Sequence, residues 1–562
     1  MRRVAIAVAL ALALAAPPAQ AGFRDTCAER ETHVICTGTV ESFDGTALDT
    51  TLTLPTGAEG DGRFPLIVFL HGFLSNKSEY MSETAAGHNY KTVEFNNVWY
   101  AERGYAVLNY SARGHGASGG QIGLASKHLE VRDTHHLTGL LVDDGTARPR
   151  RIAAIGGSYG GGQAWLLLTT RGEGATQYGA WRSPDGKAVR LAAAVPQFTW
   201  TDLLFSLVPN GRPGGVTTPL GVPKLTLIDG FIALINTKLT PDLLRWLTRV
   251  NAGEPYDGDP VAEEAKVALT EDRSAYYQAG FFDALRKGRQ RSIPVLAAQG
   301  WTDPIFPAIE AVRMYRRLRS ARPDYPIGLY FGDFEHLTSQ IKIPDMRRYH
   351  RIATRMLNRR VLGRRRPVTH AVRSAPTLCD PEAFGPVIRV RRWRALHPDS
   401  LEIELPGPRS TGSPVTDQRG PATDHVVIGA QRRGCVTTDL PDTPGVATWR
   451  VPIERDFTLL GMPRLELRYS ATGPDVQLNS RLWDVAPDGT QTLVTRGAYR
   501  VVGPESGTLA TAYDLYGNHW RFSRGHELML EVTGDDSTFF RRDNFPSVIT
   551  IDGASLTLPG RR

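Results

Sequence analysis

Six short, nearly continuous apolar runs dominate the chain between about residue 50 and residue 340, and longer helix-compatible stretches separate them. They are Leu66–Leu70, Tyr105–Tyr110, Ile152–Ile155, Leu191–Val195, Val295–Ala298 and Ile327–Phe331. Runs that are apolar on both faces are typical of parallel strands that helices cover on both sides. The alternation therefore predicts an α/β fold with a buried parallel sheet.

The alternation is interrupted between Val195 and Val295. This interval contains Leu203–Val208, Leu225–Ile235 and an amphipathic segment that begins at Thr240-Pro241, a favourable start for a helix. We therefore expect a mostly helical cap inserted at residues 199–285, which divides the core into residues 22–198 and 286–370. Such a cap would shape a pocket over the ends of the strands.

The composition changes at about Pro376, where Pro, Gly, Asp and Thr begin to separate short alternating runs. The runs are Val387–Val390, Leu401–Leu405, Arg464–Tyr469, Gln491–Thr495 and Glu527–Val532. Short strands at close spacing with frequent turn residues are typical of a β-sandwich. This pattern predicts a second domain, a sandwich over residues 376–562.

Residues 1–21 have the features of a secretory signal peptide that is cleaved after Ala21. An arginine pair precedes the apolar run Val4–Ala16, and Ala19-Gln20-Ala21 supplies the small residues of a cleavage site. At about 1.5 Å per residue, that run covers only about two thirds of a hydrocarbon core of roughly 30 Å. We expect a secreted or extracytoplasmic protein without stable membrane insertion.

Four cysteines, Cys27, Cys36, Cys379 and Cys435, would then meet an oxidising compartment. They allow three connectivities, and Cys27–Cys36 with Cys379–Cys435 is favoured because each pair falls inside one predicted domain. Four free buried thiols are the alternative.

The formal net charge of +8 is mild for a chain with 66 Lys and Arg against 58 Asp and Glu. The sequence carries no helix-turn-helix, zinc-finger or RNA-recognition signature, so we expect no nucleic-acid partner. The densest basic run, from Arg347 to Arg366, is interpreted as a solvated helix face and linker, with contact to an anionic membrane or polymer as the alternative. With 41% hydrophobic and 22% charged residues, the composition excludes a mainly disordered chain.

The strongest local motif is Gly156-Gly157-Ser158-Tyr159-Gly160, a G-x-S-x-G sequence. An apolar run enters it and a helix-compatible run leaves it, which is the context of a nucleophile elbow. A phosphate-binding loop would need a Gly-Lys-Ser/Thr sequence, and a dinucleotide site would need glycines at i, i+2 and i+5, neither of which is present. The motif predicts Ser158 as a catalytic nucleophile, and no cofactor.

A serine nucleophile needs a histidine base and a carboxylate that orients the histidine. In this architecture the acid and then the histidine follow the serine in chain order, each after a strand. Asp303 follows Val295–Ala298 and His336 follows Ile327–Phe331, so we expect a triad of Ser158, Asp303 and His336. Asp333 is the main alternative for the acid.

The oxyanion requires two preorganised donors. We expect them to be the backbone N–H of Tyr159 and that of Phe73, in the loop His71-Gly72-Phe73 after the first core strand. His71 is interpreted as a residue that holds this loop in shape. There is no H-E-x-x-H sequence, and adjacent His135 and His136 do not form one chelating face, so no metal site is predicted.

Together these motifs resemble the X-Pro dipeptidyl-peptidase and cocaine-esterase-type (CocE/NonD) serine hydrolases, a branch of the α/β-hydrolase fold with a C-terminal jelly roll. The resemblance rests on the elbow around Ser158, the Arg-Gly-containing loop Tyr110–Gly120, the ending Gly332–His336, and Ser480–Gly489 with Gly525–Leu528 in the sandwich. It implies the same triad. Those relatives use a tyrosine side chain as an oxyanion donor where this chain has His71-Gly72-Phe73, so the resemblance implies a backbone donor here.

We therefore expect a secreted serine hydrolase that cleaves a small peptide or ester through an acyl-serine intermediate. A dipeptidyl-peptidase would need a carboxylate for the substrate amine, and the cap offers Asp202, Asp229, Glu254 and Asp257, each of which is also interpretable as a solvated surface acid. Cocaine-esterase-type hydrolysis of esters or amides is one alternative. A non-catalytic secreted binding protein is an alternative of another class.

Overall fold

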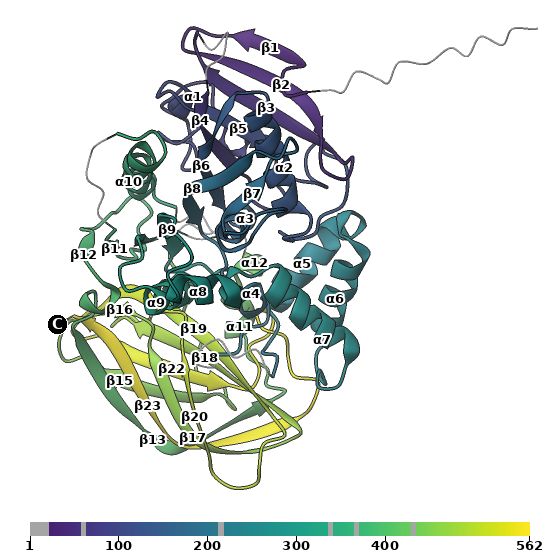
Figure 1. Cartoon of the computed structure of the whole chain (residues 1–562). Helices are drawn as coiled ribbons and strands as arrows, with labels where there is room; N and C mark the ends of the chain where they lie inside the picture. Colours follow the sequence, from purple (N-terminus) through teal and green to yellow (C-terminus); the bar gives the residue numbers. More distant parts are fainter. Residues whose placement is uncertain are drawn as a thin grey trace, which may run out of the picture.

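The computed structural model describes residues 22–57, 63–211, 219–334, 336, 341–364, 370–428 and 434–561. The predicted signal peptide, residues 1–21, lies outside this part of the chain. Figure 1 shows the helix-covered sheet joined to a β-sandwich that contains the C-terminus. Within the described residues, no helix combines the length and apolarity needed to cross a bilayer.

The larger sheet has the predicted parallel centre. Its order is β1-β2-β3-β5-β4-β6-β8-β9-β10-β11-β12. The central strands are β5 (Ala106–Tyr110), β4 (Phe64–Leu70), β6 (Ala147–Gly157), β8 (Ala188–Gln197), β9 (Val295–Gly300) and β10 (Ile327–Gly332), and all neighbouring pairs among them run parallel. Each overlaps one of the six apolar runs, which confirms the predicted α/β class.

The outermost strand pair on each side of this sheet is antiparallel. On one side lie β1 (Thr26–Glu29), β2 (His33–Glu41) and β3 (Ala47–Pro55), and on the other β11 (Val372–Ser374) and β12 (Ile388–Val390); β7 (Ala180–Arg182) pairs with β8. The prediction that Val387–Val390 is a sandwich strand was wrong, because β12 pairs with β11 and extends the first sheet. A three-residue run carries no information about its partner strand, so its sheet cannot be read locally.

Helices cover both faces of the sheet because its residues alternate between them. Leu66 and Val68 of β4 pack into one apolar cluster with α2 (Glu130–Asp143), α3 (Tyr159–Thr169) and α9 (Ile309–Ala321). Ile67 and Phe69 pack into another with α1 (Asn97–Ala101) and α10 (Ile343–Arg360). Ser158 lies where β6 meets α3, at the carboxyl edge of this sheet.

The chain between β8 and β9 is helical over most of its described residues. Its helices are α4 (Leu203–Leu207), α5 (Leu225–Ile235), α6 (Pro241–Asn251), α7 (Pro260–Val267) and α8 (Ala279–Arg286). The same segment contains short 3-10 helices at Asn236–Lys238 and Ala275–Tyr277 and a π-helical turn at Ala268–Asp272. Two further 3-10 helices lie outside it, at Lys77–Tyr80 and Trp393–Ala395. In Figure 1, α5, α6 and α7 lie together beside the core and reach toward the sandwich.

The C-terminal part is an antiparallel β-sandwich. One sheet has the order β20-β17-β23-β16-β21, with β13 on β23, and the other β14-β19-β18-β22-β15. The strands are β13 (Asp399–Ser413), β14 (Thr437–Thr438), β15 (Ala447–Pro452), β16 (Phe457–Gly461), β17 (Arg464–Thr472), β18 (Asp475–Val485), β19 (Gln491–Val502), β20 (Leu509–Asp514), β21 (Asn518–Phe522), β22 (Glu527–Thr533) and β23 (Ser547–Arg561), and helices α11 (Arg419–Ala422) and α12 (His425–Ile428) follow β13. Disulfides join Cys27 to Cys36 and Cys379 to Cys435, the favoured connectivity.

Candidate active site

Ser158 occupies a strained turn between β6 and α3. Its backbone has φ 54° and ψ −120°, which is unusual for a residue other than glycine. The glycines around it permit close backbone packing: a Cβ on Gly160 would lie 2.0 Å from the carbonyl oxygen of Leu70, and one on Gly156 would lie 2.4 Å from the carbonyl carbon of Gly160. Only glycine fits at either position, so the elbow is fixed by its sequence.

Hydrogen bonds from β8 and the segment after it hold the strained serine. The N–H of Ser158 donates to the carbonyl oxygen of Gln197 at 2.9 Å, and the Thr199 hydroxyl donates to the carbonyl oxygen of Ser158 at 2.6 Å. The N–H of Tyr159 opens α3 and therefore has no acceptor within its own helix. A helix N-terminus of this kind favours negative charge beside the serine.

Asp303 and His336 meet beyond the ends of β9 and β10. The Asp303 Oδ2 lies 2.7 Å from the His336 Nδ1, while its Oδ1 accepts from the N–H groups of Ile305 and Phe306 at 2.9 and 3.0 Å. The Asp303 side chain is fully buried and that of His336 is 21% exposed. The carboxylate is therefore fixed, and it orients an imidazole that remains accessible from solvent.

The loops that carry these residues touch one another and the segment beside the elbow. Trp301 donates its N–H to the carbonyl oxygen of Gly332 at 3.0 Å, which joins the loops after β9 and β10. Phe198 packs edge to face on Phe334, with ring centroids 5.4 Å apart, and a Cβ on Gly157 would lie 3.8 Å from the Phe198 ring. Because the carboxyl ends of β6, β9 and β10 share one edge, Ser158 lies at the same edge as Asp303 and His336.

Asp333, the alternative acid, has another partner. Its carboxylate lies 3.1 Å from the Lys342 Nζ and accepts from the N–H of Leu378 at 3.2 Å. Burial raises the Asp333 pKa to about 6, against the opposing effect of Lys342. The structure thus places Asp303, and not Asp333, on His336.

The loop after β4 presents Phe73 beside the start of α3. His71 braces this loop: its Nδ1–H donates to the carbonyl oxygen of Gly72 at 2.7 Å, and its Nε2 accepts from the N–H of Ala112 at 2.8 Å. Burial lowers the His71 pKa, so both bonds belong to the neutral ring. This arrangement agrees with the structural role that the sequence analysis gave to His71.

Aromatic rings surround Tyr159 and extend to the cap. Phe73 lies 5.9 Å from the Tyr159 ring and 4.9 Å from the ring of Phe231 on α5, both edge to face. The Tyr159 hydroxyl donates to Glu130 Oε1 at 2.9 Å, and burial raises the pKa of Glu130. His115 packs on Tyr159 at 5.2 Å, and burial lowers its pKa to about 3. The cap thus reaches the loop of Phe73 through an apolar contact.

Lys224, which was not singled out from the sequence, supports residues 301–306, the loop that carries Asp303 and is called the acid loop. It is 1% exposed, and its Nζ donates to the carbonyl oxygens of Pro304 and Ile305 at 2.7 and 2.8 Å. Burial lowers the Lys224 pKa to about 7, although Asp303 and Glu310 oppose the shift. No local pattern marks this lysine, because its partners come from a distant part of the chain.

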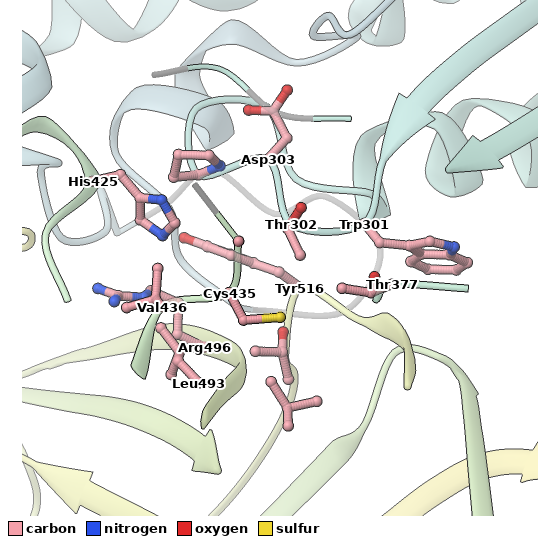
Figure 2. Close-up of a pocket in the computed structure, with 14 residues that line it drawn as sticks. Trp301, Thr302, Asp303, Thr377, His425, Cys435, Val436, Leu493, Arg496 and Tyr516 are labelled. Atoms are coloured by element: carbon pink, nitrogen blue, oxygen red, sulfur yellow. The ribbon is translucent and has the colours of Figure 1, made fainter. Parts of the chain in front are cut away.

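A small cavity lies behind the acid loop, between the core and the sandwich. Its lining includes Thr302, Asp303, Cys435, Arg496 and Tyr516. Figure 2 shows the Asp303 carboxylate turned away from Tyr516 and Cys435. At about 40 Å³ the cavity has room for a few water molecules, and neither Ser158 nor His336 lines it.

Two of the four cap acids are buried, which corrects the interpretation that all are solvated. Asp202 is 1% exposed, pairs with Arg313 at 3.0 Å and accepts from the Tyr277 hydroxyl at 2.7 Å. Glu254 is 3% exposed and faces the sandwich. Asp229 and Asp257 are exposed. Asp202 is thus committed to an ion pair within the protein.

Comparison with known proteins extends these observations. Residues 44–338, more than half of the chain, match the family model described as X-Pro dipeptidyl-peptidase (S15 family). Residues 406–561 match the model of the X-Pro dipeptidyl-peptidase C-terminal non-catalytic domain. No curated protein sequence matches the chain.

Several solved structures share the fold. An α-amino acid ester hydrolase is 15% identical, with a TM-score of 0.64 and coverage of 94% of this chain and 97% of the other. An aminopeptidase from a marine sediment Thaumarchaeota archaeon is 15% identical, with a TM-score of 0.61 and the same coverage. A CocE/NonD family hydrolase from Staphylococcus aureus is 13% identical, with a TM-score of 0.61 and 94% coverage of both chains. At these identities the likeness concerns the fold alone.

Proposed function

The chain belongs to the X-Pro dipeptidyl-peptidase (S15) family of serine hydrolases, and on this basis we propose that it cleaves a peptide or ester acyl bond through an acyl-Ser158 intermediate. The observation that carries the proposal is the 2.7 Å contact between Asp303 and His336, at the sheet edge where Ser158 opens α3. A buried carboxylate, an imidazole and a strained serine at one edge are the parts of an acyl-transfer site.

Each residue has a defined role in this proposal. Asp303 keeps the proton of His336 on Nδ1, so Nε2 is the nitrogen that takes the proton of the Ser158 hydroxyl during attack. His336 then returns that proton to the leaving amine or alcohol, and the same steps with water release the acyl group. The N–H groups of Tyr159 and Phe73 stabilise the tetrahedral oxyanion.

The substrate proposal is an X-Pro dipeptidyl-peptidase-like activity, with ester hydrolysis as the second candidate. Family membership supports the first. Ester hydrolysis is supported by the apolar contact of Phe73 with Phe231, beside the proposed oxyanion donors. It is also supported by the ion pair of Asp202 with Arg313, because a paired carboxylate is not available to bind a substrate amine. Two disulfides support an extracytoplasmic location for the protein.

One experiment tests the catalytic part and a second the substrate. A fluorophosphonate probe should label the wild-type protein and fail to label Ser158→Ala, and equal labelling of both would refute the assignment of the nucleophile. The rates of hydrolysis of Gly-Pro and Ala-Pro arylamides should then be compared with those of short-chain aryl esters. Faster cleavage of the arylamides supports the peptidase, and cleavage of the esters alone supports the esterase.

A further inference from the structure

Three buried carboxylates, none of them among the proposed catalytic residues, meet where the cap touches the sandwich. Glu254 lies between α6 and α7, Asp475 opens β18, and Asp543 lies between β22 and β23. They are 3%, 3% and 6% exposed. One oxygen atom of each lies within 4.8 Å of an oxygen atom of both others. Like charges gathered in this way repel one another unless a cation or a proton separates them.

The surrounding arginines balance only part of this charge. Arg500 forks onto Asp475, with its Nε 2.8 Å from Oδ1 and its Nη2 against Oδ2. Glu254 has only distant ion pairs, at 3.6 Å with Arg500 and at 3.7 Å with Arg541. The nitrogens of Arg541 instead donate to the carbonyl oxygens of Asn251 and Arg542 and to the side chain of Asn544. Two guanidinium groups thus face three carboxylates, so ionisation of all three leaves one negative charge in excess.

One carboxylate oxygen in the cluster has no hydrogen bond within the described part of the chain. Asp543 Oδ1 accepts from the N–H of Phe545 at 3.0 Å, but its Oδ2 is fully buried without a donor. Glu254 has only long contacts, at 3.4 Å to both the Gln477 side chain and the N–H of Asn544. Burying an ionised oxygen without a partner is unfavourable, because the oxygen loses its hydration and gains no hydrogen bond in exchange. The orphaned oxygen therefore points to a ligand.

We propose that Glu254, Asp475 and Asp543 bind a hard divalent cation of the calcium type at the junction of cap and sandwich. Calcium takes oxygen ligands at about 2.3–2.6 Å, so ligands on opposite sides of one ion lie about 4.6–5.2 Å apart. The spacing of the three carboxylates fits this span. Asp475 keeps lone pairs for the ion, because each oxygen of its fork with Arg500 has two.

The ion links parts of the chain that are distant in sequence. It would join the segment between α6 and α7 to the start of β18 and to the segment between β22 and β23. Because a ligand that binds only the folded state stabilises it, the expected effect is on thermal stability and on the attachment of the cap. The proposal does not depend on the assigned catalytic residues.

The test uses the full-length protein after treatment with EDTA and removal of the chelator. Addition of CaCl2 in excess of its Kd should raise the Tm by about 2–5 °C, the size expected for saturating one site in a protein of this length. Tb3+ should bind with luminescence sensitised by tyrosine, since Tyr256 is two residues from Glu254, and CaCl2 should quench the signal by displacement. MgCl2, whose ligands must lie at about 2.0–2.1 Å, should give a smaller shift.

Matched variants complete the test. Asp543→Asn and Glu254→Gln should abolish both the Tm shift and the Tb3+ signal, whereas Asp488→Asn, in an exposed turn of the sandwich, should preserve both. A wild-type protein with the same Tm in EDTA and in CaCl2, and without a displaceable Tb3+ signal, would overturn the proposal. So would a response that Asp543→Asn and Glu254→Gln both leave unchanged. Either result would leave the proposed hydrolase function intact.

Discussion

Replacement of Lys224 by methionine removes a side chain that ties the cap to the acid loop through Pro304 and Ile305. Methionine fills a similar volume and cannot donate a hydrogen bond. The carbonyl oxygens of Pro304 and Ile305 then lose their donors at 2.7 and 2.8 Å. Because the N–H groups of this same loop hold Asp303, we expect the acid to lose part of its orientation toward His336.

Two opposing free energies determine the stability of Lys224→Met. Two buried carbonyl oxygens without donors cost about 1–3 kcal/mol each. The wild type, however, must release a proton on folding at pH 8, since the Lys224 pKa is lowered from 10.5 to about 7. Releasing that proton costs about 1.4 kcal/mol for each pH unit by which pH 8 lies below the unfolded pKa, or about 3 kcal/mol in total. Lys224→Met does not bear this cost, because it has no proton to release. We expect the free energies of unfolding at pH 8 to agree within about 3 kcal/mol.

The pH dependence has a definite sign. The folded pKa of Lys224 lies below the unfolded one, so between pH 7 and pH 10.5 the unfolded chain binds more protons and stability rises with pH. Lys224→Met lacks this contribution. The difference in unfolding free energy between the two proteins should therefore grow in favour of the wild type, by up to about 1.4 kcal/mol per pH unit.

Urea unfolding at pH 7.5, 8.5 and 9.5 measures this difference, with Lys238→Met, an exposed lysine of the cap, as the matched control. Under saturating substrate, kcat of Lys224→Met should fall about 10- to 100-fold, as expected when a catalytic group shifts by up to about 1 Å. KM should change little. Parallel pH curves for the wild type and Lys224→Met, together with an unchanged kcat, would refute the assignment of Lys224 as the support of the acid loop.

Three further predictions concern the elbow and the triad. Ser158→Ala should abolish turnover while the Tm stays equal or rises, because the strained φ of 54° is the same in both proteins and folding needs no partner for the hydroxyl. A lowered Tm together with residual turnover would contradict this prediction. Asp303→Asn should lower kcat by about 10³–10⁴-fold, as loss of the carboxylate that fixes the histidine tautomer does in other triads. Asp333→Asn should lower kcat far less. Steady-state kinetics of both variants with one aryl ester measure the difference. Gly160→Ala places a Cβ 2.0 Å from the carbonyl oxygen of Leu70. The variant should therefore be insoluble or lose several kcal/mol of stability, on the order of severe overpacking. A urea midpoint equal to that of the wild type would contradict the packing of the elbow.

The elements that sequence reasoning placed correctly are those with a strong local signal. Each central strand is a run of apolar residues between helices, and Ser158, Asp303 and His336 each follow such a strand. Because the carboxyl ends of parallel strands meet at one edge, chain order alone predicts that these three lie near one another. The glycines of the elbow act through steric exclusion at short range, which a motif records directly.

The residues that sequence reasoning missed or misjudged depend on long-range packing. Lys224 lies in a largely apolar segment and Glu254 in a polar one, and both side chains are buried against parts of the chain that follow much later. Asp202 is buried by its pairing with Arg313 on α9. Burial of a charged group is stable only when distant partners compensate it, and a local pattern contains no record of those partners.

The sandwich also contributes to the position of Asp303, the proposed catalytic acid, through the cap. The N–H of Leu225 donates to the carbonyl oxygen of Phe539 at 3.0 Å, and the N–H of Arg541 donates to that of Pro223 at 2.8 Å. These backbone bonds flank Lys224, whose Nζ holds the loop of Asp303. The segment between β22 and β23 thus fixes the backbone from which Lys224 extends. The sandwich, which supplies none of the proposed catalytic residues, can in this way influence the position of Asp303. The loop of Asp303 packs on the segment around Lys224, and that segment packs on the sandwich.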